Sequence, residues 1–140
     1  MWVVDTCIVI DVLDSVSGFA RPSALALDDH REEGLIVAPI TFVELAPAFN
    51  GSVADELDFL AELGIDLDFA GQRDAILAAH QAWYAHICRK RMGAIAKRPI
   101  ADVLIGAYAQ TMGGLITRNE DDFRSLYPTL TIFNPTRSNG

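Results

Sequence analysis

Short apolar runs separated by helical repeats occupy the first part of the chain. Residues 2–5 form an apolar run that closes on Asp5, and residues 35–40 form a second run. Runs of this length are typical of strands in a parallel sheet that is covered on both faces. The residues between them predict two helices, over 6–14 and 22–33. The pattern therefore predicts a strand, two helices and a second strand.

The same alternation continues to the end of the sequence. Ile65, Leu67 and Phe69 alternate with aspartates, which indicates an exposed or edge strand. Helical spacing and end signals predict further helices over 41–49, 53–63, 72–91 and 99–112, and strands over 115–117 and 130–133. Strands alternating with helices favour an α/β fold with a mostly parallel sheet. We expect one domain over residues 1–140.

Composition narrows the class of protein. Hydrophobic residues make up 51% of the chain and charged residues 21%, which excludes a disordered protein. Cys7 and Cys88 have neither CxxC nor metal-type spacing, so we expect reduced thiols. Asp5 interrupts the first apolar stretch, and no apolar run is long enough to cross a membrane. A cytoplasmic location without a signal peptide is therefore the expectation.

The net charge of -8, taken alone, argues against nucleic-acid binding, because phosphate contacts require Lys and Arg. The distribution of charge changes this picture. No Asp or Glu occurs between Ala75 and Ala101, and that interval holds a basic stretch: Arg89, Lys90, Arg91, Lys97 and Arg98. This stretch could be a solvated helix end. We favour phosphate binding, because it leads directly into the helix that carries Asp102.

Acidic residues follow the predicted strands. Asp5 ends the first strand, and Glu44 lies one helical turn after the second. Asp102 lies in the first turn of a later helix, and a later strand is followed by Asn119, Glu120, Asp121 and Asp122. Ligands of open parallel sheets bind beyond the carboxyl ends of the strands. These side chains are therefore expected together at one edge of the sheet.

Each acid also has a purely structural explanation. Asp5 could cap the helix that begins at Thr6, and Asp102 could complement a helix dipole. Glu44 could close a capping box with Thr41. These explanations do not account for acids among apolar neighbours that share one edge. Clustered carboxylates repel one another, and Mg²⁺ or Mn²⁺ relieves this repulsion and suits phosphodiester hydrolysis.

Four segments in this order resemble the PIN domain, and VapC-type toxins of bacterial toxin–antitoxin pairs in particular. They are Val3-Val4-Asp5-Thr6, Thr41-Phe42-Val43-Glu44-Leu45, Ile100-Ala101-Asp102-Val103-Leu104-Ile105, and Ile116-Thr117-Arg118-Asn119 with Asp122-Phe123. The resemblance implies a three-layer α/β/α sandwich around a mostly parallel sheet. It also implies an endoribonuclease dependent on Mg²⁺ or Mn²⁺, with metal-binding acids at Asp5, Glu44 and Asp102.

The fourth acidic position of the family departs from its usual pattern. Many members have an acid directly after Thr-Arg, where this chain has Asn119, which offers a carbonyl oxygen without a charge. Asp122 is the next candidate for a catalytic role, and Asp121 is the third. We expect one metal held firmly by Asp5 and Asp102. Three further residues have candidate roles, Thr6 and Thr117 in positioning water or phosphate, and Arg118 in binding RNA.

The resemblance implies three partners: RNA, a cognate antitoxin and a second copy of the chain in a homodimer. We expect the antitoxin to cover apolar helix surface and to present a basic side chain to the acidic site. Two alternatives stay open. A haloacid-dehalogenase-like phosphatase also begins with an Asp after a strand, but it normally has a second Asp where this chain has Cys7. A non-catalytic PIN-like binding module is favoured by Asn119 alone.

Overall fold

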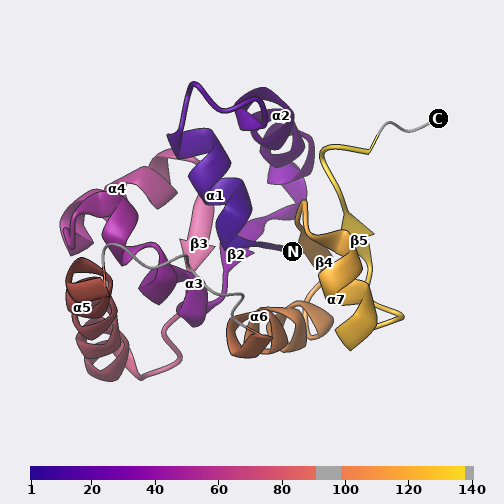
Figure 1. Cartoon of the computed structure of the whole chain (residues 1–140). Helices are drawn as coiled ribbons and strands as arrows, with labels where there is room; N and C mark the ends of the chain where they lie inside the picture. The colour runs from indigo at the N-terminus through magenta and orange to yellow at the C-terminus, as the bar shows by residue number, and fades with distance from the viewer. Residues whose placement is uncertain (91–98, 138–140) are drawn as a thin grey trace.

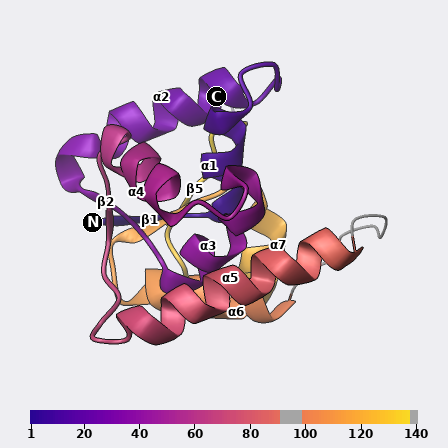
Figure 2. The ribbon, with the colours of Figure 1, turned by 90° about the vertical axis from the view of Figure 1, so that its left-hand side faces the viewer.

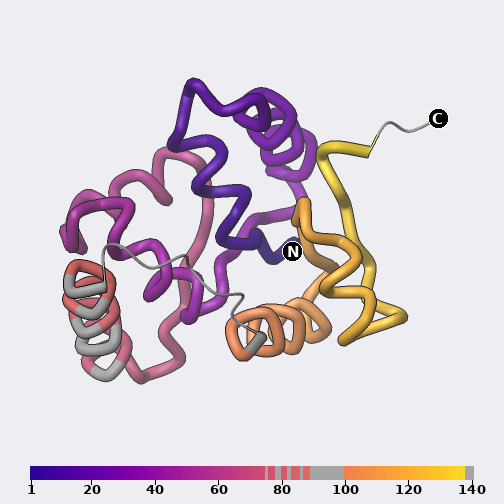
Figure 3. Tube along the Cα trace, viewed as in Figure 1, coloured from indigo at the N-terminus to yellow at the C-terminus, as the bar shows by residue number. Residues whose placement is uncertain are grey.

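A five-stranded parallel sheet forms the centre of the molecule. The computed structural model describes residues 1–90 and 99–137 (Figure 3). The strand order is β3-β2-β1-β4-β5, and every neighbouring pair is parallel. The strands are β1 (Trp2–Val4), β2 (Leu35–Val37), β3 (Ile65–Leu67), β4 (Gly114–Ile116) and β5 (Ile132–Phe133). The expected parallel sheet is confirmed, with β3 at an edge.

Helices cover both faces of this sheet (Figures 1 and 2). One face is covered by α1 (Thr6–Leu13), α2 (Ala20–His30) and α4 (Val53–Glu62). The opposite face is covered by α6 (Pro99–Gln110) and α7 (Glu120–Leu126). Beside the sheet, α3 (Pro39–Glu44) packs against α5 (Arg73–Lys90). The α/β/α sandwich is therefore confirmed.

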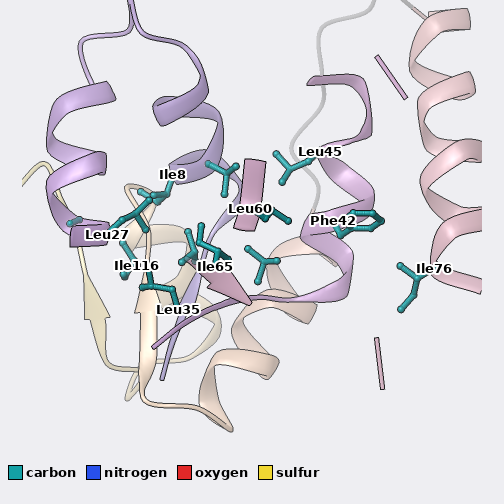
Figure 4. Close-up of a cluster of buried hydrophobic side chains, with 13 residues drawn as sticks. Ile8, Leu27, Leu35, Phe42, Leu45, Leu60, Ile65, Ile76 and Ile116 are labelled. Atoms are coloured by element: carbon teal, nitrogen blue, oxygen red, sulfur yellow. The ribbon is translucent and has the colours of Figure 1, made fainter. Parts of the chain in front are cut away.

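Neighbouring residues of the strands point into different cores. Val4 packs in a cluster with Ile8 and Leu60, part of which Figure 4 shows, whereas Val3 packs against Ile105 and Phe123 on the other face. Each such buried side chain contributes about 1.5–3 kcal/mol to the free energy of folding. The central strands are therefore fixed from both sides, and so are the residues at their ends.

The structure corrects several predicted boundaries. The apolar run 35–40 is not one strand, because β2 ends at Val37 and Pro39 begins α3. Proline suits the first turn of a helix, where its missing N–H is not needed. The predicted helix 41–49 is α3 followed by a short 3-10 helix, Ala46–Phe49. A second 3-10 helix, Arg31–Glu33, follows α2.

Strand order places a topological switch point at the carboxyl end of β1. The chain runs outward from β1 through β2 to β3, and it then returns to the other side of β1 for β4 and β5. Adjacent strands at such a switch point carry connections that leave in opposite directions, which opens a space where ligands bind. The residues that follow β1 and β4 are therefore the ones to inspect first.

Candidate active site

Asp5 lies at this switch point and is buried. Its backbone N–H donates to Ile116 O at 3.0 Å, and its side chain is the N-cap of α1, accepting from Thr6 N at 2.7 Å. The second carboxylate oxygen accepts from Thr117 Oγ1 at 2.6 Å and from Cys7 Sγ at 3.4 Å. The expected cap at Asp5 is therefore present, and the carboxylate is also fastened to the end of β4.

The pKa of Asp5 is raised to about 6: burial is the main cause, the hydrogen bond from Thr117 opposes it, and the charge of Asp102 adds to the rise. Asp102 is in the first turn of α6, as predicted. The structure therefore brings Asp5 and Asp102 close enough to repel each other, although α1 and α6 cover opposite faces of the sheet. Burial, followed by the charge of Asp5, also raises the pKa of Cys7, so this thiol is a neutral donor.

Glu44 joins the site through Thr6. Thr6 Oγ1 donates to Glu44 Oε1 at 2.8 Å, and Thr41 Oγ1 lies 3.1 Å from the same hydroxyl. The capping box proposed for Thr41 and Glu44 is wrong, because α3 begins at Pro39 and Glu44 is its last residue. Glu44 is therefore half-buried, and it accepts a hydrogen bond from α1 instead of capping its own helix.

The residues after β4 separate into two groups. Thr117 is fully buried, and its hydroxyl accepts from Asn119 N at 3.0 Å, so the turn is fixed to the same oxygen that holds Asp5. Asn119 itself is exposed and Asp122 is half-buried in the first turn of α7. The side chain of Asp121 is 96% exposed and lies 3.7 Å from Arg137.

The donor chemistry of this site fits a hard divalent cation. In the described part of the chain, no group of three or more His, Cys, Asp and Glu side chains is arranged to hold a metal ion. Mg²⁺, however, commonly takes one or two carboxylates and fills its remaining positions with water. Asp5 and Asp102 supply that pair, and a cation would relieve the repulsion between them, which adds to the effect of burial on the pKa of Asp5.

The residues predicted to bind RNA fall into two classes. For the basic stretch, the positions 91–98 and the side chains of Arg89 and Lys90 lie outside the described residues, so that prediction is not tested. Arg118 is described, and its guanidinium is bound to the buried Asp11, with Nε 2.6 Å from Oδ2 and the terminal nitrogen 2.9 Å from Oδ1. Arg118 therefore forms an ion pair within the fold, and its contact with RNA stays a prediction.

Two other buried acids, Asp11 and Glu56, were missed by the sequence analysis. Glu56 on α4 is fully buried, and its Oε1 lies 2.7 Å from His80 Nε2 on α5. Glu56 Oε2 has no hydrogen-bond partner in the described structure. Burial raises the pKa of Glu56 to about 9 and lowers the pKa of His80. The two residues lie 24 positions apart on different helices, and no local pattern connects them.

Comparison with known proteins agrees with this geometry. The PIN domain family matches residues 2–127, a range that includes every acid of the site. The chain belongs to the PIN-domain family. Comparison with curated proteins and with solved structures gave no significant match. PIN domains are generally nucleases and typically use divalent metals, so the family agrees with the carboxylate pair in this PIN domain.

Over residues 1–90 and 99–137, the structure contains no helix that is long and apolar enough to cross a membrane.

Proposed function

We propose that this PIN domain is a metal-dependent endoribonuclease and the toxin of a VapC-type toxin–antitoxin pair. The observation that supports the nuclease activity is the Asp5–Asp102 pair. Asp5 is buried at the switch point of the sheet, held by Thr117, and close enough to Asp102 for their charges to interact. Two carboxylates so placed repel each other when both are charged, and a cation bound by both would relieve that repulsion.

Each residue of the site has a defined task in this proposal. Asp5 and Asp102 hold Mg²⁺ or Mn²⁺, which when bound activates water and neutralises phosphate oxygens. Thr117 and Thr6 orient Asp5 and Glu44 through the hydrogen bonds described above. Glu44 supplies a further carboxylate on the side of α3. Two residues after β4 have further roles in the proposal. Asn119 is a neutral oxygen ligand of the cation, and Asp122 is an acid that acts on water.

Cleavage of single-stranded RNA tests the nuclease activity. Wild-type protein with Mg²⁺ or Mn²⁺ should cleave the RNA, and addition of EDTA should stop cleavage. Asp5→Asn should lose activity by orders of magnitude, whereas Asp66→Asn, which removes an exposed carboxylate from β3, should retain it. Equal activity of Asp5→Asn and wild type would contradict the assignment of Asp5.

The antitoxin is proposed to bind the hairpin of α1 and α2. Four large apolar side chains are exposed there: Ile10 (45%), Val16 (91%), Phe19 (43%) and Leu25 (48%). An apolar helix of the antitoxin would bury these side chains, and the net charge of -8 favours a basic residue that reaches the acids. Expression of the toxin alone should arrest growth of its host. Normal growth with folded, abundant protein would rule out the toxin role.

A homodimer is proposed to form through α6 and α7. These two helices pack together and expose Ile100 (75%), Val103 (40%), Leu104 (49%) and Leu126 (40%). A second copy would bury this surface, and the two Asp102 residues would lie next to the interface. Light scattering should therefore give the mass of a dimer, and Leu104→Lys should give that of a monomer.

The alternative function is a non-catalytic PIN-like module that binds RNA or protein. Asn119, which stands in place of an acid, favours it. The family match leaves the dehalogenase-like phosphatase without support, since Cys7 replaces its second Asp. RNA binding with no metal-dependent cleavage would favour the binding module.

A further inference from the structure

Arg118 and Asp11 form a buried ion pair close to the active site. The Asp11 side chain is 4% exposed and that of Arg118 is 23% exposed. Both oxygens of Asp11 accept from the guanidinium, and Oδ2 also accepts from Ser23 Oγ at 2.8 Å. The guanidinium also lies over the ring of Phe19, 4.0 Å from its centre. Arg118 is therefore fixed in the fold by its hydrogen-bonding edge and by one of its faces.

These contacts connect three separate segments. Asp11 is in the second turn of α1, Ser23 is in α2, and Arg118 follows β4. A two-point Arg–carboxylate pair fixes direction as well as distance, because the guanidinium is planar and rigid. The ion pair thus fixes the residue after β4 relative to α1.

The same two segments meet at the active site. Thr117, the residue before Arg118, donates to Asp5, and Asp5 caps the helix that contains Asp11. Two joints therefore connect the end of β4 to α1, one at Thr117 and Asp5 and one at Arg118 and Asp11. Because Arg118 follows Thr117 directly in the chain, the ion pair with Asp11 limits how far the backbone of Thr117 can move away from Asp5.

We infer that Arg118 is a positioning residue of this PIN domain, whose ion pair with Asp11 holds Thr117 against Asp5 and so maintains the geometry in which Asp5 binds a divalent cation. The inference rests on the proposed function for the role of the cation. It differs from a direct role of Arg118 with RNA, because the guanidinium fork is bound to a buried carboxylate. Residues that orient a metal ligand through hydrogen bonds typically change metal affinity about 10–100-fold when they are replaced.

Arg118→Lys tests this inference, since lysine keeps the charge and loses the two-point geometry. Amide hydrogen exchange without metal should become faster at Asp5 and Asn119, whose N–H groups bond to Ile116 O and Thr117 Oγ1. Mn²⁺ affinity, measured by calorimetry, should fall at least tenfold. Arg124→Lys is the matched control, because Arg124 pairs with Glu120 on α7 and should leave both measurements unchanged.

Asp11→Asn provides a second variant that alters the same pair from the other side. This variant should accelerate hydrogen exchange at the amides of Asp5 and Asn119. It should not strengthen the binding of a short single-stranded RNA in the absence of metal. Unchanged exchange in both variants would overturn the inference, as would a loss of metal-free RNA affinity in Arg118→Lys alone. If wild type fails to bind Mn²⁺, the proposed function fails, and faster exchange in the variants would still support the positioning role.

Discussion

Asp5 caps a helix and also carries a charge that interacts with Asp102, and replacing Asp102 separates these two effects. As the N-cap of α1, Asp5 stabilises the helix, and as a buried carboxylate it carries a raised pKa, near 6. A carboxyl whose pKa is raised above its unfolded value of 3.8 contributes stability that is lost as the pH rises through about 6. Above that pH, the charged Asp5 faces Asp102, and the fold without metal is weakened.

Asp102→Asn should therefore raise the melting temperature of metal-free protein at pH 8. Loss of the Asp102 charge lowers the pKa of Asp5, although burial, its largest cause, is unchanged. The same variant should lose most of the rise in melting temperature that Mn²⁺ gives to wild type. Thermal denaturation with and without Mn²⁺ measures both effects. A variant that responds to Mn²⁺ as wild type does would place the metal elsewhere.

Glu44→Gln separates charge from hydrogen bonding on α3. Glutamine retains an oxygen that can accept from the Thr6 hydroxyl, so stability should change by less than about 1 kcal/mol. RNA cleavage should fall by orders of magnitude if the Glu44 charge acts in the site. Denaturant unfolding and single-turnover cleavage provide the two measurements. Cleavage at the wild-type rate would limit Glu44 to a structural role.

At the scale of helices and strands, local sequence patterns predicted which segments form strands and where some helices end. Apolar runs predicted the strands, and Gly64 correctly predicted the end of α4. The start of α3 was misplaced because the apolar run continues through Pro39. The helix α7 was missed because Glu120, Asp121 and Asp122 resemble a turn, although negative charges are favourable in the first turn of a helix.

Contacts between distant elements could not be predicted from those patterns. The acids of the site were found because strand ends of a parallel sheet meet at one edge, which is a rule of topology. No such rule joins Asp11 to Arg118, 107 positions away, or Glu56 to His80. Asp11 and Glu56 lie in helices whose sequences would also allow these positions to face solvent. Only the folded structure shows that the two acids are buried.

The buried contact between Glu56 on α4 and His80 on α5 should give the protein a pH at which its stability is greatest. The buried Glu56–His80 pair holds one proton in the folded state at neutral pH, whichever atom carries it. Unfolded, Glu56 titrates near 4.5 and His80 near 6.5, so the unfolded pair also holds one proton between these values. Stability should therefore decline above about pH 6.5, toward the folded pKa of about 9, and below about pH 4.5.

The slope of stability against pH can be calculated, and the alkaline decline can be tested with a matched control. Where folded and unfolded states differ by one proton, the free energy of unfolding changes by about 1.4 kcal/mol per pH unit. Glu56→Gln should remove the contribution on the alkaline side, and Glu62→Gln, an exposed change in the same helix, should not. Urea unfolding from pH 4 to 9 measures the difference. Parallel curves for wild type and Glu56→Gln would show that the pair holds no extra proton.

At the scale of the whole molecule, the acidic charge opposes the approach of RNA. We therefore expect the proposed nuclease to bind phosphates at the basic stretch, which precedes α6 and Asp102 in the sequence. Replacement of Lys97 and Arg98 with alanine should weaken RNA binding about tenfold at low salt and flatten the salt dependence, because each lost phosphate contact removes about 0.7 released counterions. The melting temperature should change little.

Filter binding between low and moderate salt measures this slope. Arg21→Ala is the control, since Arg21 is an exposed arginine of α2 on the opposite face of the sheet from α6. If the double variant keeps the wild-type slope while Arg21→Ala does not, RNA binds across α2 instead.

The position of β1 between β2 and β4 also has a consequence for synthesis on the ribosome. Asp5 is translated long before Thr117, its hydrogen-bond partner 112 positions later. Until β4 emerges from the exit tunnel, the first strand lacks one of its two neighbours, and the acidic site has only part of its framework. A nascent chain or a truncated message that stops before β4 would therefore yield no active nuclease, so the ribosome would finish the chain before the proposed activity could begin.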